Sequence, residues 1–252
     1  MIRRWGVIPA AGLGTRIQPL AFSKELLPVG TRNEGATERP RAVGEYLLER
    51  MLIAGVSRVC FVISPAKCDI VSYFGGQING ASICYAIQQN PNGLCDAIFS
   101  TLPFIAPEDE VLVGLPDTVW FPAEGFKFLP DGQFSFLLFP VAQPELFDAV
   151  ITNDSGLVQE IQVKQPAPAS EWVWGAFKLS GKILADLHRL WIRRQRSDQY
   201  IGTLVNAYLT DGGTALGIKR GDSYVDVGTL HGYREAVRVL SSEQEVLNEV
   251  GR

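Results

Sequence analysis

Short apolar runs alternate with stretches of helical periodicity along most of the chain. Between residues 42 and 54, apolar side chains recur at helical spacing, so that Leu47, Leu48 and Met51 would share one face of a helix. Compact apolar runs between polar turns predict buried strands at residues 5–9, 58–64, 82–87, 111–113 and 135–141. The alternation of strands and helices predicts an α/β fold with a mixed, mainly parallel central sheet flanked by helices.

The second part of the chain continues this alternation with a larger share of strand. Two or three strands are expected between residues 146 and 177, around a polar turn at residues 153–156, and two more at 214–218 and 223–227. Helices are predicted at 69–74, 93–102, 181–196 and 230–240. Residues 31–41 are polar and contain Gly35 and Pro40, so we expect a soft segment there. Because no linker separates two halves, the sequence predicts a single domain over residues 1–252.

Composition and charge narrow the classes of function. With 23 basic and 27 acidic residues the net charge is −4, so nucleic acid is not an expected partner, because proteins that bind the phosphate backbone carry a basic excess. No apolar run reaches the roughly 18 residues that span a bilayer, so no membrane partner is expected. The chain begins like a secretory leader, but its short apolar stretch runs into Gly12, Gly14 and Arg16, which argues against one.

The cysteines and histidines bear on metal binding and on the compartment. No two of the four cysteines form a Cys-x-x-Cys pair, and the chain has only two histidines, so a zinc site is not predicted. We expect a cytoplasmic protein whose thiols are reduced and buried.

A glycine-containing loop, Ala10-Ala11-Gly12-Leu13-Gly14-Thr15-Arg16, directly follows the first predicted strand. Glycines in this position allow backbone N–H groups to approach and bind phosphate oxygens. Ile17 stands where a dinucleotide-binding fingerprint needs its third glycine, and no Gly-Lys-Ser/Thr follows, so neither the dinucleotide nor the P-loop pattern is present. The planar fork of Arg16 suits a bare polyphosphate. On the glycines alone, a simple strand-to-helix turn explains the loop equally well.

Further motifs follow this loop in a fixed order. Lys24 stands eight residues after Arg16 and opens the run Lys24-Glu25-Leu26-Leu27-Pro28. It is followed by Gln88 with Gly93, Leu115-Pro116-Asp117-Thr118, Val163-Lys164-Gln165-Pro166, Val173-Trp174-Gly175 and Tyr224-Val225-Asp226-Val227-Gly228-Thr229. Together these motifs resemble the sugar-1-phosphate nucleotidyltransferases, or nucleotide-sugar pyrophosphorylases, and most of all the glucose-1-phosphate thymidylyl/uridylyl group. The resemblance covers about residues 5–240.

The resemblance implies a fold and a set of site residues. The fold would be Rossmann-like, with a nucleotide-binding half at about residues 1–140 and a small sugar-binding lobe at about 141–240. Arg16, Lys24 and Lys164 would be catalytic, and Asp117 and Asp226 would share Mg²⁺. The nucleotide would be bound by Ala11, Gly12, Leu13, Gly14, Thr15, Gln88 and Gly93, and the sugar pocket would be lined by Ala149, Val163, Val173 and Gly175.

The implied reaction joins a sugar-1-phosphate to a nucleoside triphosphate and releases pyrophosphate. The second pKa of a phosphate monoester lies near 6, so the nucleophile is ionised at neutral pH and needs no general base. Positioning and cations would supply the catalysis. Gln88 with Gly93 favours dTTP or UTP. A CTP-dependent cytidylyltransferase and a non-catalytic regulatory paralogue that binds nucleotide sugars remain open, as does a homo-oligomer, since relatives often form one.

Several positions depart from the family pattern. Val163 stands where the family has a glutamate that accepts a hydrogen bond from a sugar hydroxyl, and Asp148-Ala149-Val150 stands where Tyr-Gly-Val is frequent. These departures favour an unusual sugar or cyclitol phosphate as the acceptor. Glu25 replaces a glutamine, and its carboxylate would be repelled by a nucleotide phosphate unless it faces Mg²⁺ or Lys24.

Overall fold

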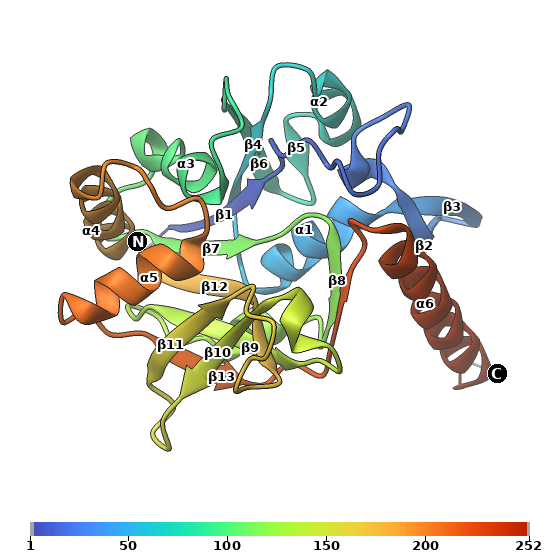
Figure 1. The fold of residues 1–252 in the computed structure, drawn as a ribbon. Coiled ribbons are helices and arrows are strands. Elements are labelled where there is room, and N and C mark those ends of the chain that lie inside the picture. The colour runs from blue at the N-terminus through green and yellow to red at the C-terminus, as the bar shows by residue number, and fades with distance from the viewer. Residues whose placement is uncertain (1–2, 251–252) are drawn as a thin grey trace.

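A ten-stranded mixed sheet runs through the centre of the molecule in the computed structural model (Figure 1). The structure describes residues 3–250, and for residues 242–250 it describes the backbone alone. Its strands follow the order β11-β10-β12-β7-β1-β4-β6-β5, and β9 and β13 extend it beside β12. The helices α1–α5 flank this sheet, which confirms the predicted α/β fold with a mixed central sheet. Met1 and Ile2, which begin the leader-like stretch, lie outside the described residues.

The first half of the chain forms the parallel centre of the sheet. Its strands are β1 (Arg4–Pro9), β4 (Arg58–Ile63), β6 (Ala81–Ile87) and β7 (Glu110–Gly114), with the short β5 (Gln77–Ile78) antiparallel at the edge. The helices between them are α1 (Val43–Ile53), α2 (Cys68–Phe74) and α3 (Leu94–Phe99), with the 3-10 turns η1 (Lys24–Leu26) and η2 (Leu102–Phe104). Every residue of β7 is buried, as expected for a strand covered on both faces.

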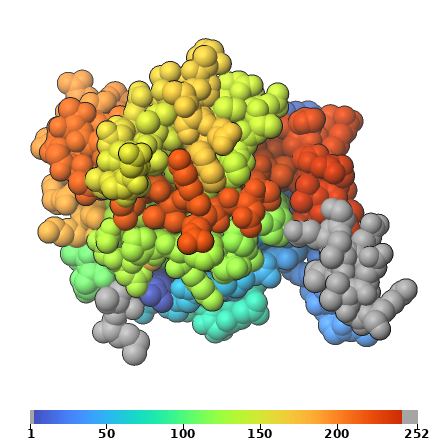
Figure 2. Space-filling view, turned by 90° about the horizontal axis from the view of Figure 1, so that it is seen from below, coloured from blue at the N-terminus to red at the C-terminus, as the bar shows by residue number. Residues whose placement is uncertain are grey.

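The second half adds mostly antiparallel strands. β12 (Trp172–Ser180) pairs with β7 and with β9 (Ser135–Pro140), and β10 (Asp148–Thr152) lies between β12 and β11 (Val158–Val163). β13 (Leu216–Lys219) runs parallel to β9, and the chain around it lies on the face seen in Figure 2. The remaining elements are α4 (Gly181–Arg193), α5 (Ile201–Thr210) and the turns η3 (Gly125–Phe128) and η4 (Pro144–Leu146).

Two small ribbons leave the main sheet. β8 (Thr118–Phe121) pairs antiparallel with β14 (Ser223–Asp226), so the chain just after β7 meets a segment near the C-terminus. β2 (Pro28–Glu34) and β3 (Thr37–Ala42) form a hairpin beside α6 (Leu230–Val250) (Figure 1). Residues 31–41, which the sequence marked as a soft segment, form most of this hairpin. These residues pair through their backbones, and Gly35 turns the chain with a φ of +63°.

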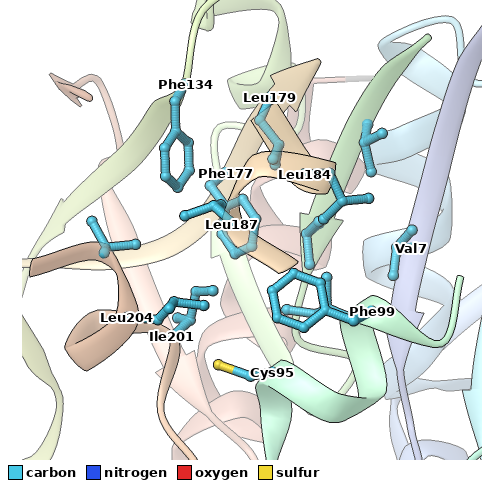
Figure 3. Close-up of a cluster of buried hydrophobic side chains, with 14 of the residues drawn as sticks. Val7, Cys95, Phe99, Phe134, Phe177, Leu179, Leu184, Leu187, Ile201 and Leu204 are labelled. Carbon is cyan, nitrogen blue, oxygen red and sulfur yellow. The ribbon is translucent and has the colours of Figure 1, made fainter. Parts of the chain in front are cut away.

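The core lies on both faces of the sheet, because neighbouring residues of a strand point to opposite sides. Val7 of β1 points into a cluster with helices α3, α4 and α5, whereas Ile8 points toward Leu47, Leu48 and Met51 of α1. Figure 3 shows part of the first cluster, with Cys95, Phe99, Leu184, Leu187, Ile201 and Leu204 from the helices, Phe177 and Leu179 from β12, and Phe134 just before β9. Among the described residues, no helix is long and apolar enough to cross a membrane.

Candidate active site

The predicted site residues gather where the parallel strands end. The glycine-containing loop follows β1, Gln88 follows β6, and Asp117 follows β7. Since the carboxyl ends of parallel strands meet at one edge of a sheet, these segments surround a common cavity. The cavity measures about 610 Å³, and the predicted residues that line it are Gly12, Arg16, Lys24, Gly93, Asp117 and Lys164.

Lys24 and Asp117 form the central ion pair of this cavity. Lys24 Nζ donates a hydrogen bond to Asp117 Oδ2 at 2.5 Å. Burial works to lower the pKa of Lys24, but Asp117 and other nearby carboxylates outweigh it and the pKa is raised. Burial likewise works to raise the pKa of Asp117, but Lys24 outweighs it and the pKa is lowered. Both side chains are therefore charged at neutral pH.

A second ion pair joins the glycine loop to the ribbon formed by β8 and β14. Arg16 Nη1 donates to Asp226 Oδ2 at 2.9 Å, and Asp226 is the last residue of β14. The backbone N–H of Val227 donates to the carbonyl of Asp117 at 2.8 Å, which ties the two acidic segments together. The β8–β14 pairing thus explains how residues so distant in the sequence reach the same cavity.

The two carboxylates converge on Gly228. A Cβ atom at this glycine would lie 2.8 Å from Asp117 Oδ2 and 2.9 Å from Asp226 Oδ1, so no larger residue fits without moving them. The described residues contain no group of three or more His, Cys, Asp or Glu side chains arranged around a metal position. Mg²⁺ needs no such cage, because it is often held by one or two carboxylates together with phosphate oxygens and water. Asp117 and Asp226 fit that donor set.

The glycine loop packs tightly against Lys24. Gly14 has a φ of +67°, and a Cβ there would lie 2.9 Å from Cδ of Lys24. Ala11 is buried, whereas Leu13 and Thr15 are exposed. A Cβ atom added at Gly12 would have no other heavy atom within 4 Å, its own chain neighbours aside. The loop therefore leaves room for a ligand at Gly12 while Gly14 keeps the backbone close to the lysine.

Glu25 has a direct partner that the sequence did not suggest. Its carboxylate is fully buried and accepts two hydrogen bonds of 2.8 Å from Lys67 Nζ, which also donates to the carbonyl of Ala10 at 2.6 Å. Burial raises the pKa of Glu25, and the attraction of Lys67 only partly opposes this. Lys24 also attracts the Glu25 carboxylate, but the direct partner is Lys67, which ties the start of the glycine loop to the segment of Lys24.

Asp69 fixes the other side of this segment. It accepts hydrogen bonds from the backbone N–H and the hydroxyl of Ser23, at 2.6 and 2.7 Å. Burial works to raise the pKa of Asp69, but these hydrogen bonds outweigh it and the pKa is lowered. Sequence reasoning missed both Lys67 and Asp69. The only signal was their place in the loop and helix after β4, at the same edge of the sheet.

Gln88 and Gly93 meet at the start of α3. Gln88 Nε2 donates to the carbonyl of Gly93 at 3.2 Å and to Asp96 Oδ2 at 2.7 Å. Gly93 has a φ of +100°, and a Cβ there would lie 2.9 Å from the carbonyl oxygen of Gln199. This close approach requires glycine and brings the segment before α5 to the cavity rim.

The predicted sugar-pocket residues lie in the strands behind the cavity rather than among the residues that line it. Ala149 and Val173 are buried and face each other in register across β10 and β12. Val163 lies against Gly202 of α5. Gly175 makes room for the ring of Tyr224, since a Cβ would lie 2.5 Å from that ring. A different set of residues lines the end of the cavity next to these strands, which we call the acceptor end. Sequence reasoning missed them as site residues: Leu146, Phe147, Asp148, Trp174, Gln199, Tyr200 and Tyr224.

Lys164 lies at the rim of the cavity's acceptor end. Its backbone has a φ of +49°, which is uncommon for a residue with a side chain. Its Nζ donates to the carbonyl of Leu146 at 2.7 Å and lies 3.9 Å from Asp148 Oδ1. The structure thus brings Arg16, Lys24, Asp117 and Lys164 to one cavity, and Asp226 lies beside it in an ion pair with Arg16.

A mixed α/β sheet with a parallel centre, and with paired acidic and basic groups at the carboxyl ends of the parallel strands, is typical of proteins that bind nucleotides. Residues 5–243 match the sequence model of the nucleotidyl transferase family, and the chain belongs to this family. It is a nucleotidyltransferase, which confirms the class predicted from the motifs.

Known relatives and solved structures agree with this assignment. The chain is 27% identical over 258 residues to the glucose-1-phosphate thymidylyltransferase of Neisseria meningitidis, covering 96% of this chain and 84% of that protein. It is 25% identical over 253 residues to the enzyme of the same name from Mycolicibacterium smegmatis, covering 95% and 84%. The fold is shared with a putative glucose-1-phosphate thymidylyltransferase from Bacillus anthracis (TM-score 0.79, 23% identity, 94% and 95% covered). It is also shared with UTP-bound UGPase from Acinetobacter baumannii (TM-score 0.75, 20% identity, 99% of both chains covered).

Proposed function

We propose that this protein catalyses a Mg²⁺-dependent transfer of a nucleotidyl group from dTTP or UTP to a sugar-1-phosphate, releasing pyrophosphate. The observation that carries the proposal is that Arg16, Lys24 and Asp117 line one cavity at the carboxyl ends of the strands, where Lys24 pairs with Asp117 and Arg16 pairs with the adjacent Asp226. Two cations would meet the triphosphate there, and two carboxylates would meet its metal ion. A purely regulatory binding protein would not require this full set.

The chemistry needs no general base from the protein. An oxygen of the acceptor phosphate, already ionised at neutral pH, attacks the α-phosphorus of the triphosphate. The bond between that phosphorus and the oxygen bridging to the β-phosphate breaks, and pyrophosphate leaves with the bonding electrons. Arg16 and Lys24 would hold the triphosphate and the departing pyrophosphate, while Lys164 would hold the acceptor phosphate. Asp117 and Asp226 would hold Mg²⁺, which when bound neutralises charge on the triphosphate.

The choice of a pyrimidine nucleotide rests on Gln88 with Gly93 and on the names of the relatives. Those names include thymidylyltransferases and a uridylyltransferase. Gln88 is held by Gly93 and Asp96 at the start of α3, which gives the base-binding segment a fixed shape. CTP remains the alternative, because it shares the pyrimidine ring.

The test measures pyrophosphate release with Mg²⁺ across dTTP, UTP, CTP, dATP and GTP, each paired with a panel of sugar-1-phosphates. We expect release with dTTP or UTP, and its loss by orders of magnitude in Asp117→Ala. Release only with CTP would establish the cytidylyltransferase. Folded protein that binds a nucleotide sugar but releases no pyrophosphate with any pair would contradict the proposal and favour the regulatory paralogue.

A further inference from the structure

The acceptor end of the cavity contains a buried carboxylate, Asp148, one of whose oxygens has no hydrogen-bond partner among the described residues. Asp148, the first residue of β10, is 8% exposed and lines the cavity. Its Oδ1 is buried, and no hydrogen-bond partner for it lies among the described residues. A buried carboxylate oxygen that accepts no hydrogen bond is costly, so a cavity that contains one is suited to a ligand that brings a donor or a positive charge.

The protein's own Lys164 shows what kind of group fits beside this carboxylate. Its ammonium group lies 3.9 Å from Asp148 Oδ1, 2.7 Å from the carbonyl oxygen of Leu146 and 5.9 Å from the centre of the Phe147 ring. A carboxylate, a carbonyl and an aromatic face are the surroundings that stabilise an ammonium ion. The side chain of Lys164 is 49% exposed, so it can leave this position.

Binding of the acceptor phosphate removes this internal cation from Asp148. In the proposed function Lys164 holds the acceptor phosphate, and one ammonium group cannot neutralise a phosphate and Asp148 at the same time. Burial already raises the pKa of Asp148, with Lys164 the largest opposing influence and the indole N–H of Trp174 the next. Once Lys164 turns to the phosphate, Asp148 is left without its cation.

We propose that the acceptor is an amino-sugar 1-phosphate, whose ammonium group takes the place beside Asp148 that Lys164 occupies in the free protein. This inference rests on the proposed function and specifies its substrate. Each positive charge then has one partner: Lys164 pairs with the phosphate, and the substrate's ammonium pairs with Asp148. The rings of Phe147, Trp174 and Tyr224 line the same end of the cavity and add surfaces that attract a cation.

The apolar position Val163 agrees with this assignment. It packs against Gly202 rather than lining the cavity, so it offers no carboxylate for a sugar hydroxyl. Asp148 is instead the acidic residue at the acceptor end, and it comes from the neighbouring strand β10, where Asp148 is in register with Val163. The carboxylate at this end is therefore that of Asp148, which is more buried than Val163 and already has the ammonium group of Lys164 beside it.

The experiment compares matched acceptors at neutral pH by pyrophosphate release. Hexose 1-phosphates with an amine at C2, C3, C4 or C6 are each paired with their N-acetylated form and with glucose 1-phosphate. We expect at least one free amine to exceed both neutral partners by about tenfold or more in kcat/KM. In Asp148→Asn that preference should fall to about the level of the neutral sugars, whereas Glu145→Gln, which removes an exposed carboxylate outside the cavity, should retain it.

The outcomes separate this inference from the function on which it rests. Release that is as efficient with glucose 1-phosphate as with every amino sugar overturns the inference and leaves the proposed function standing. An amine preference that persists in Asp148→Asn also overturns it, because another group would then recognise the cation. Release with none of the acceptors overturns both.

Discussion

Replacing Lys67 by methionine tests the buried ion pair that supports the glycine loop. The substitution removes two hydrogen bonds of 2.8 Å to Glu25 and one of 2.6 Å to the Ala10 carbonyl, and leaves a carboxylate that is only 1% exposed without its cation. Removing one partner of a buried pair costs about 3–5 kcal/mol. For a chain of this size, about 2–4 °C per kcal/mol gives a fall in Tm of roughly 6–20 °C at neutral pH.

The loss of stability should depend on pH in a defined direction. Burial raises the pKa of Glu25 in the folded wild type, so the protonated form is favoured by folding. That contribution to stability is present below the unfolded pKa of Glu25 and is lost as the pH rises through its folded pKa. Without Lys67 the folded pKa rises further. The difference in unfolding free energy between wild type and Lys67→Met should therefore be small in acid and should grow toward neutral pH, by at most about 1.4 kcal/mol per pH unit.

Chemical denaturation between pH 4 and pH 8 measures this difference, with two further variants. The double variant Glu25→Gln/Lys67→Met removes both charges and should recover most of the lost stability, because no buried charge remains. Lys182→Met, which removes an exposed lysine on α4, should change the free energy of unfolding by less than about 0.5 kcal/mol. A Lys67→Met variant as stable as Lys182→Met at neutral pH, or a double variant less stable than the single one, would refute the reasoning.

Two predictions concern the charged groups of the cavity. Arg16→Lys keeps the charge but loses the planar fork, so turnover should fall strongly. Tm should stay near the wild-type value, since the side chain is 60% exposed. Wild-type rates of pyrophosphate release would show that Arg16 does not act in the site. Gly228→Ala places a Cβ about where it contacts oxygens of both Asp117 and Asp226, so the Mg²⁺ concentration for half-maximal rate should rise by about tenfold or more. Gly76→Ala, with open space around its Cβ, serves as the control, and an unchanged Mg²⁺ dependence in Gly228→Ala would mean that these carboxylates do not hold the ion.

The parts of the fold that could be predicted are those whose burial leaves a pattern in the sequence. Strand β4 was predicted at residues 58–64 and runs from Arg58 to Ile63, because a strand covered on both faces is a continuous apolar run. The β2–β3 hairpin was missed because it is largely exposed, so its strands carry no alternating apolar pattern. The structure also has strand β8 and helix α5, which the sequence did not indicate. β8 has four residues and depends on pairing with the distant β14.

The candidate site likewise contains some residues that the sequence indicates and others that only the structure reveals. Arg16, Lys24, Asp117, Lys164 and Asp226 stand in motifs. The structure places the first four around one cavity and Asp226 beside it, paired with Arg16. Glu25 stands in a motif too, but its partner could not be found from the sequence, because Lys67 reaches it only through the packing of the loop after β4. Trp174 and Asp148 were noted beside the expected pocket, yet only the structure shows that both line it. A motif thus identifies groups with a shared chemistry, whereas their neighbours depend on tertiary packing.

The ion pairs of the cavity divide into those that can exchange partners and one that cannot. Arg16 is largely exposed, and an exposed ion pair contributes only about 0–1 kcal/mol, so a phosphate can take Arg16 from Asp226 at little cost. Lys164 is half exposed, but its partner Asp148 is buried, so taking this cation costs more unless another positive charge replaces it. Glu25 and Lys67 are buried together, and separating them would leave a charge without water or partner. The buried pair therefore holds the loop and the Lys24 segment in place while the exposed pairs exchange their carboxylates for the phosphates of the substrates. Lys24 and Asp117 lie between these limits, so we expect their exchange to contribute most to the cost of binding the triphosphate.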